Sequence, residues 1–113
     1  MAAVQKIDVW SASVTGNDSG AALSLDALQT DFVAFVNVSA LGAGTTAIIK
    51  LERSPNNSDW FEWISFKAVA AVGKQIKDAT VPGLSYVRGS VSFAGGTTTA
   101  TLEITLHHDK KTK

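Results

Sequence analysis

Apolar and polar residues alternate in short runs along most of this 113-residue sequence, and no other feature limits the possible folds as strongly. In residues 31–40, for example, every second residue from Phe32 to Val38 is apolar. This period of two is typical of strands, because successive side chains of a strand point to opposite faces. Clusters of Gly, Asn, Asp, Ser and Pro separate the runs and favour turns. The sequence therefore predicts an all-β chain.

The expected strands share this alternation and lie at residues 4–14, 31–40, 46–53, 60–66, 84–94 and 97–106. Residues 31–40 are apolar on both faces, as in a central strand that is covered on both sides. The pair Gly95-Gly96 suits a two-residue turn, so we expect residues 84–94 and 97–106 to form a hairpin.

Two segments are less regular. Residues 22–28 fit a short strand, although residues 26–29 are equally compatible with one helical turn. Residues 67–81 are rich in alanine and fit an edge strand better than a helical turn, with Gly73 at a bend.

Seven to eight short strands in about 100 residues are typical of a two-sheet sandwich or a small barrel. We expect an antiparallel β-sandwich that resembles a jelly roll. The length suits one domain, so we assign residues 1–106 to a single sandwich and residues 107–113 to a short basic tail.

Composition excludes several classes of function. The chain has no cysteine, so it has no disulfide framework, thiolate metal site or cysteine nucleophile. Ten basic residues balance ten acidic ones, which argues against nucleic acid or an anionic membrane as the main partner. No apolar run is long enough to span a membrane, and the first eight residues lack the pattern of a secretory signal. We expect synthesis in a cytoplasm.

Residues for catalysis are scarce. The two histidines are the adjacent His107 and His108, which point to opposite faces of a strand and cannot chelate one metal ion together. We expect them at a solvated strand end, too far from the core for a Ser-His-Asp triad. Asp59 and Glu62 are three residues apart, on opposite faces, and do not form the carboxylate pair of a glycosidase. We expect no enzymatic activity, no cofactor and no metal site.

An aromatic cluster is the first candidate for a binding site. Trp60, Phe61 and Trp63 follow a polar loop that contains Asn56 and Asn57. Strand alternation places Trp60 on one face and the other two aromatic residues on the opposite face, so at least one ring points outward. Three interpretations remain open: a core tryptophan with a covered edge aromatic, a protein interface, or a platform on which sugars stack.

Arg88 is the second candidate. Its side chain is expected on the face opposite Val87, where two roles are open. It either pairs with a carboxylate such as Glu103 across the predicted hairpin or contacts another subunit. Pairing across the hairpin is the more economical interpretation.

Three segments carry a resemblance to a known group of proteins. They are Ser-Pro-Asn-Asn-Ser-Asp-Trp at residues 54–60, Pro-Gly-Leu-Ser-Tyr-Val-Arg at residues 82–88, and Gly-Gly followed by Thr-Thr-Thr-Ala-Thr-Leu-Glu-Ile-Thr-Leu at residues 95–106. In this pattern, residues 31–106 resemble small β-sandwich or jelly-roll virion proteins of tailed bacteriophages, in particular capsid decoration (cement) proteins.

The resemblance implies a structural role without an active site or cofactor. Such proteins bind the outside of the head, commonly as homotrimers, where they contact the major capsid protein and stabilise the capsid. It also implies synthesis in the cytoplasm of a bacterial host and a final location on the virion. Two alternatives are a phage tail or neck component and a carbohydrate-binding module with a glycan ligand.

Overall fold

The computed structural model describes residues 4–25, 31–80 and 85–109, and every regular element in these ranges is a strand. The strands are β1 (Val4–Val14), β2 (Asp18–Ser19), β3 (Leu23–Leu25), β4 (Asp31–Leu41), β5 (Thr46–Ser54), β6 (Phe61–Ser65), β7 (Gly73–Thr80), β8 (Ser85–Ala94) and β9 (Ala100–Asp109). Within these ranges, no helix is long and apolar enough to cross a membrane.

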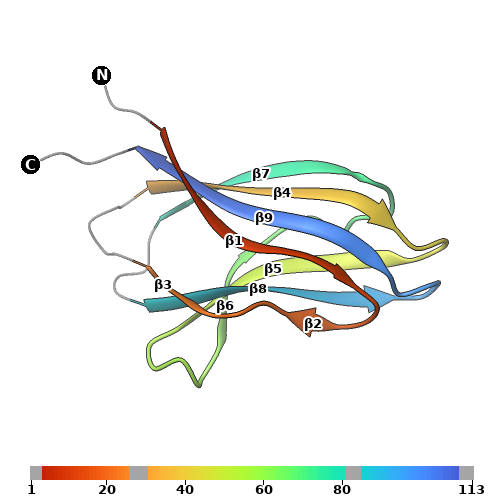
Figure 1. Cartoon of the computed structure of the whole chain (residues 1–113), viewed down its shortest axis with the longest axis horizontal. Coiled ribbons are helices and arrows are strands. Elements are labelled where there is room, and N and C mark those ends of the chain that lie inside the picture. The colour runs from red at the N-terminus through yellow and green to blue at the C-terminus, as the bar shows by residue number, and fades with distance from the viewer. Residues whose placement is uncertain (1–3, 26–30, 81–84, 110–113) are drawn as a thin grey trace, which may run out of the picture.

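The strands form two antiparallel sheets that face each other (Figure 1). One sheet has the order β1-β9-β4-β7, and the other has the order β2-β8-β5-β6, with β3 also paired to β8. Because β5 occupies the other side of β8, β2 and β3 share one edge and act as an interrupted strand. Counted in this way, the strand order is that of a jelly roll. The predicted jelly-roll-like sandwich is confirmed.

The core lies between the two sheets and is built by strand alternation. In β4, the residues from Phe32 to Val38 with even numbers are buried, as predicted. The opposite sheet contributes Ala47, Ile49 and Leu51 from β5, with Val87 and Val91 from β8, and β9 adds Ala100, Leu102, Ile104 and Leu106. Burial of such side chains contributes about 1.5–3 kcal/mol each and is the main source of stability in a chain without disulfides.

The predicted hairpin at Gly95-Gly96 is wrong, because β8 and β9 belong to different sheets. Both glycines have positive φ values, 72° and 54°, as a tight turn requires. The turn crosses from one sheet to the other, so the apolar faces of the two strands meet in the core instead of lying side by side. The Thr45 hydroxyl donates a hydrogen bond of 2.9 Å to the Gly95 carbonyl oxygen, which stabilises this turn. A Gly-Gly pair suits both connections, so the sequence pattern does not distinguish them.

The expectation that β4 is covered on both faces holds only in part. The strand is central, between β9 and β7, and its even-numbered face is buried. Val33 and Phe35 on its other face are half-buried, because a sandwich has only two layers. Phe35 contacts a neighbour in the same sheet, the ring of His107, at a centroid distance of 6.2 Å.

The structure shows the secondary structure of the two irregular segments wherever it describes their residues. Residues 67–81 contain an edge strand, β7, and the bend occupies residues 70–72, directly before Gly73. Residues 22–28 contain the short strand β3, whereas the alternative helical turn at 26–29 lies outside the described residues. The sheet continues beyond the predicted boundary at residue 106, because β9 pairs with β1 as far as Asp109.

Candidate functional site

The outer face of the β8-β5-β6 sheet carries a cluster of charged side chains. Glu52 lies directly opposite Arg88, and Lys50 lies opposite Ser90. The Arg88 Nε donates a hydrogen bond of 2.8 Å to Glu52 Oε1, and the two side chains are only 27% and 21% exposed. The more exposed Lys50 Nζ lies 3.6 Å from Glu62 Oε1. Arg88 is therefore held in one orientation by a neighbouring strand.

Trp60 adds a second contact to Arg88. The guanidinium carbon lies 4.2 Å from the centroid of the Trp60 ring, in a cation–π arrangement. Arg88 is thus fixed between a carboxylate and an indole, and it covers one face of that indole. Its predicted pairing with Glu103 is wrong, because Glu103 is in β9 and therefore in the other sheet.

Hydrogen bonds organise the loop between β5 and β6. The buried Ser54 hydroxyl donates to Asn56 Oδ1 at 3.0 Å and accepts from the Asn56 and Ser58 amides at 3.2 and 3.3 Å. Asn56 Oδ1 also accepts from the amides of Ser58 and Asp59 at 3.0 and 2.9 Å, while its Nδ2 donates to Asp59 Oδ2 at 2.8 Å. Asn57 has a positive φ of 61°. Asn56 thus closes an Asx turn, with its Oδ1 as the acceptor.

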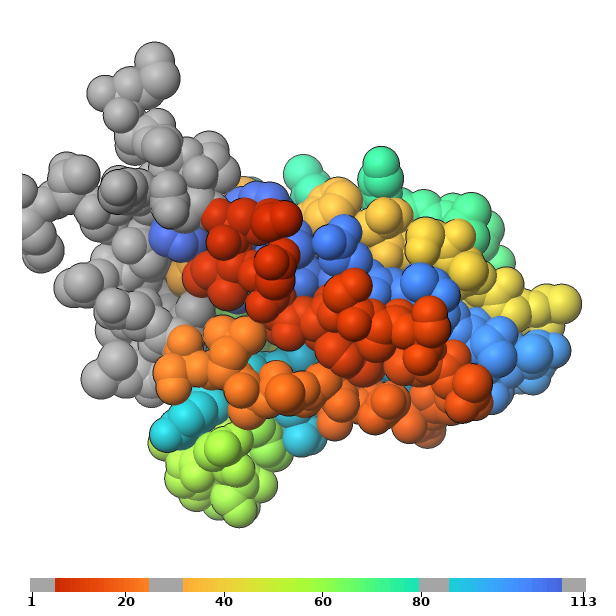
Figure 2. Space-filling view, viewed as in Figure 1, coloured from red at the N-terminus to blue at the C-terminus, as the bar shows by residue number. Residues whose placement is uncertain are grey.

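This loop projects from the body of the sandwich. In Figure 1 it extends below β6, and Figure 2 shows it as a separate yellow-green lobe. It belongs to β5 and β6, which are consecutive strands that pair in one sheet. Polar residues of the loop and aromatic residues of β6 therefore lie close in space as well as in sequence.

The three aromatic residues do not share a face. Trp60 stacks on Arg88, Phe61 is 58% exposed, and Trp63 meets the buried Phe32 edge-on at a centroid distance of 6.3 Å. The predicted alternation fails because the β5–β6 register shifts between Glu62 and Ile64, which is a β-bulge at Trp63. One ring thus packs on the core and two lie at the surface, so the rings form no common stacking platform.

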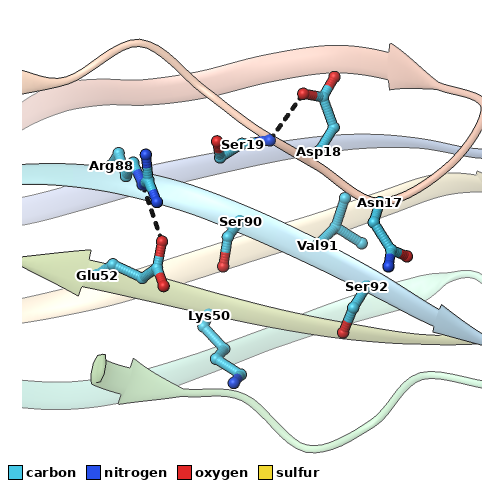
Figure 3. Close-up of a pocket in the computed structure, with 9 residues that line it drawn as sticks. All are labelled: Asn17, Asp18, Ser19, Lys50, Glu52, Arg88, Ser90, Val91 and Ser92. Carbon is cyan, nitrogen blue, oxygen red and sulfur yellow. Dashed lines mark hydrogen bonds and ion pairs between the residues drawn. The ribbon is translucent and has the colours of Figure 1, made fainter. Parts of the chain in front are cut away.

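An open depression of about 460 Å³ borders Arg88 (Figure 3). Most of its lining residues are of polar types, and they come from β8, β5 and the segment around β2: Asn17, Asp18, Ser19, Lys50, Glu52, Arg88, Ser90, Val91 and Ser92. Asn17 and Asp18 have structural roles as well, since Asn17 Oδ1 accepts from the Phe93 amide at 3.0 Å and Asp18 Oδ1 accepts from the Ser19 amide at 2.8 Å.

Sequence reasoning found Arg88 but missed these neighbours. Strand alternation puts Lys50 and Glu52 on the solvent-facing side of β5, but their contact with Arg88 depends on the pairing of β5 with β8. A sequence pattern within one strand does not report that pairing.

The histidines point to opposite faces, as predicted. His108 meets the inward-facing Phe32 edge-on at 5.4 Å, whereas His107 meets Phe35 on the outer face and lies 2.9 Å from the Thr105 hydroxyl through Nε2. Both are half-buried within β9 rather than at a solvated end. Across the described residues, no group of three His, Asp or Glu side chains is placed to hold a metal ion.

No protein-family model matches the chain, and no curated protein matches it either.

Proposed function

We propose that this chain is a non-enzymatic structural protein of a phage virion, a capsid decoration protein that binds the outer head surface and stabilises it. Its partner in this proposal is the major capsid protein. The observation that carries the proposal is the exposed Phe61, with 58% of its surface accessible at the start of β6, directly after the projecting β5–β6 loop. Trp60 at the end of this loop is held in a fixed pair with Arg88.

The composition of this surface supports binding to a protein. Aromatic residues and arginine are enriched where protein interfaces gain most of their energy. A loop that is already held by hydrogen bonds from Ser54 and Asn56 loses little conformational entropy on binding. Arg88 is similarly fixed before any partner arrives.

The proposed location on a virion rests on the resemblance of residues 31–106 to phage virion proteins. The jelly-roll fold alone does not distinguish a virion protein from a sugar-binding protein, because this architecture occurs in viral capsid proteins and in lectins. The three sequence segments that carry the resemblance include the projecting loop at residues 54–60 and the segment that ends at Arg88. Residues 54–60 form that loop, and Arg88 lies on the surface described above, so two of the three segments support a role for this surface.

Co-sedimentation with purified heads tests the proposal. The proposal implies a phage whose genome encodes this chain; heads assembled from that phage's major capsid protein are the target, and free tails serve as the competing target. We expect the wild-type chain to sediment with heads, and Phe61→Ala to weaken binding by about 30-fold, as for a hot-spot residue. Val72→Ala is the matched control, because Val72 is 59% exposed and lies outside the loop. A chain that never sediments with heads contradicts the proposal, and sedimentation with tails alone assigns it to the tail or neck.

Sugar binding is the second candidate, favoured by the depression lined by Arg88, whose guanidinium also contacts the Trp60 ring. The divergent aromatic rings count against it, because stacked sugars need open ring faces. A glycan array decides between the two. Binding that is lost in Trp60→Ala would support this candidate, whereas binding unchanged in Trp60→Ala and Trp63→Ala would exclude this site.

A further inference from the structure

Strand β7 differs from the other strands at the sheet edges. It pairs with β4 over all eight of its residues without a register shift, and its second side pairs with no strand among residues 4–25, 31–80 and 85–109. At the other edges, the pairings of β1 and β6 contain bulges, and β2 and β3 are two and three residues long. Bulges and short strands prevent pairing between sheet edges. Among the described edge strands, β7 is therefore the long one that has neither a bulge nor an interruption.

The side chains of β7 complement a second copy of the same strand. In an antiparallel pair with two-fold symmetry, the axis passes through one residue, which then lies opposite its own copy. If that residue is Ile76, Lys74 lies opposite Asp78 of the second copy, and Asp78 lies opposite Lys74. Opposite charges in such positions stabilise a pair of strands.

The alternative registers are worse. An axis through Lys74, Lys77 or Asp78 places a charge opposite the same charge, and an axis through Gln75 creates no opposite-charge pair. The Ile76 register also uses residues 73–79, almost the whole strand. Lysines often discourage edge pairing, but in this register neither lysine of β7 meets a like charge.

Contacts among the residues that the structure describes leave this edge available. The Lys77 Nζ donates to the Ser65 carbonyl at 2.9 Å, and Gln75 bonds to the backbone N–H and carbonyl of Lys67 at 3.0 and 2.8 Å. These side chains brace β7 against the segment that follows β6. Ile76 is 70% exposed on the opposite face, directly across from Phe35 in β4.

We propose that β7 pairs with β7 of a second copy of this chain, antiparallel and with the two-fold axis at Ile76. The two four-stranded sheets then form one continuous sheet. The contact covers the edge of β7 and places the two Ile76 side chains together beside the two Phe35 rings. It does not rest on the proposed virion role, and it predicts a two-fold dimer instead of the homotrimer that the resemblance implies.

Charge reversal at the pairing positions tests the register. We expect sedimentation equilibrium to give twice the chain mass of 11.8 kDa for the wild type. Lys74→Asp and Asp78→Lys each create two like-charge pairs, and each is expected to weaken dimerisation about tenfold or more. The double variant K74D/D78K restores both pairs and dimerises. An equimolar mixture of the two single variants forms a heterodimer, because all facing charges are then opposite.

A matched control uses the exposed ion pair of Lys6 and Asp8 in β1, whose atoms are 3.5 Å apart. Lys6→Asp is expected to leave the dimer unchanged. A monomer or a trimer for the wild type, or equal dimerisation of the single and double variants, overturns the proposal. Circular dichroism confirms that each variant is folded.

A cross-link provides a second test that does not depend on charge. The chain has no cysteine, so Ile76→Cys introduces a single thiol on the axis. Directly opposite Cβ atoms lie about 4.5–5.5 Å apart, close to the distance that a disulfide spans. With copper phenanthroline as the oxidant, we expect a covalent dimer for Ile76→Cys and none for Lys74→Cys, whose copies lie far apart in this register. Equal cross-linking of both variants would overturn the register.

Discussion

Replacement of Gly20 by alanine tests how the sandwich closes at the β2–β3 edge. The amide of Gly20 donates to the Gly89 carbonyl at 2.9 Å, and the ring of Trp10 packs over this contact. A Cβ at position 20 would lie 2.6 Å from both Cγ and Cδ1 of Trp10 and 3.0 Å from its Cδ2. These are the three nearest atoms, so the substitution acts mainly on the indole.

The expected loss follows from overpacking. Inserting a methyl group into a packed site costs about 1–3 kcal/mol when the neighbours have to move. The same substitution without a clash stabilises by about 0.4–1 kcal/mol, because alanine restricts the unfolded chain. Gly20 does not have a positive φ, so backbone strain adds nothing. We therefore expect Gly20→Ala to lower the free energy of unfolding by about 1–3 kcal/mol.

Urea unfolding followed by far-UV circular dichroism measures this loss. Gly16→Ala is the matched control, because a Cβ there meets no atom within 4 Å, and we expect it to raise the free energy of unfolding by about 0.4–1 kcal/mol. In a Trp10→Ala background the clash is absent, so Gly20→Ala is expected to cost nothing, with a coupling free energy of about 1–3 kcal/mol. Equal stability of Gly20→Ala and Gly16→Ala would refute the reasoning.

Three further predictions concern the turns and the charged surface. Ser54→Ala removes a fully buried hydroxyl that makes three hydrogen bonds, so urea unfolding is expected to show a loss of about 1–3 kcal/mol; a loss below 0.5 kcal/mol would contradict this role. A double-mutant cycle of Arg88→Ala and Glu52→Ala is expected to give a coupling of about 1 kcal/mol, whereas Arg88→Ala with Glu103→Ala is expected to be additive. Gly96→Ala is expected to lower the melting temperature strongly, since its φ is 54° and a Cβ would lie 2.3 Å from a backbone carbon of the facing turn; an unchanged melting temperature would contradict this.

The sequence predicts the strands well because the alternation of apolar and polar residues within each strand shows which of its faces is buried. The even-numbered residues of β4 face the core as their alternation indicates, and β5 separates a buried face from the face of Lys50 and Glu52. Alternation fails where a bulge inserts a residue, as at Trp63, because a period of two contains no information about the partner strand. The strand is then predicted correctly while the direction of a side chain is not.

Strand pairing is harder to predict for the same reason. Gly95 and Gly96 mark a tight turn, and the sequence cannot tell whether the chain turns within a sheet or crosses between sheets. Two apolar strands joined by such a turn satisfy their burial in both arrangements. The choice depends on β1 and β4, which flank β9, and on β5, which flanks β8. It is therefore made by the whole fold rather than by the turn.

The jelly-roll connectivity explains which parts of the candidate surface can be predicted from the sequence. In this fold, most consecutive strands lie in different sheets, so neighbours on an outer face come from distant parts of the chain, as Arg88 and Glu52 do. The β5–β6 connection stays within one sheet, which keeps Asn56, Trp60 and Phe61 together in space. The cluster of loop and aromatic residues could therefore be predicted from the sequence, whereas the ion pair of Arg88 and Glu52 could not. A binding assay with Phe61→Ala and Arg88→Ala therefore measures separately what the local aromatic residue and the long-range ion pair contribute.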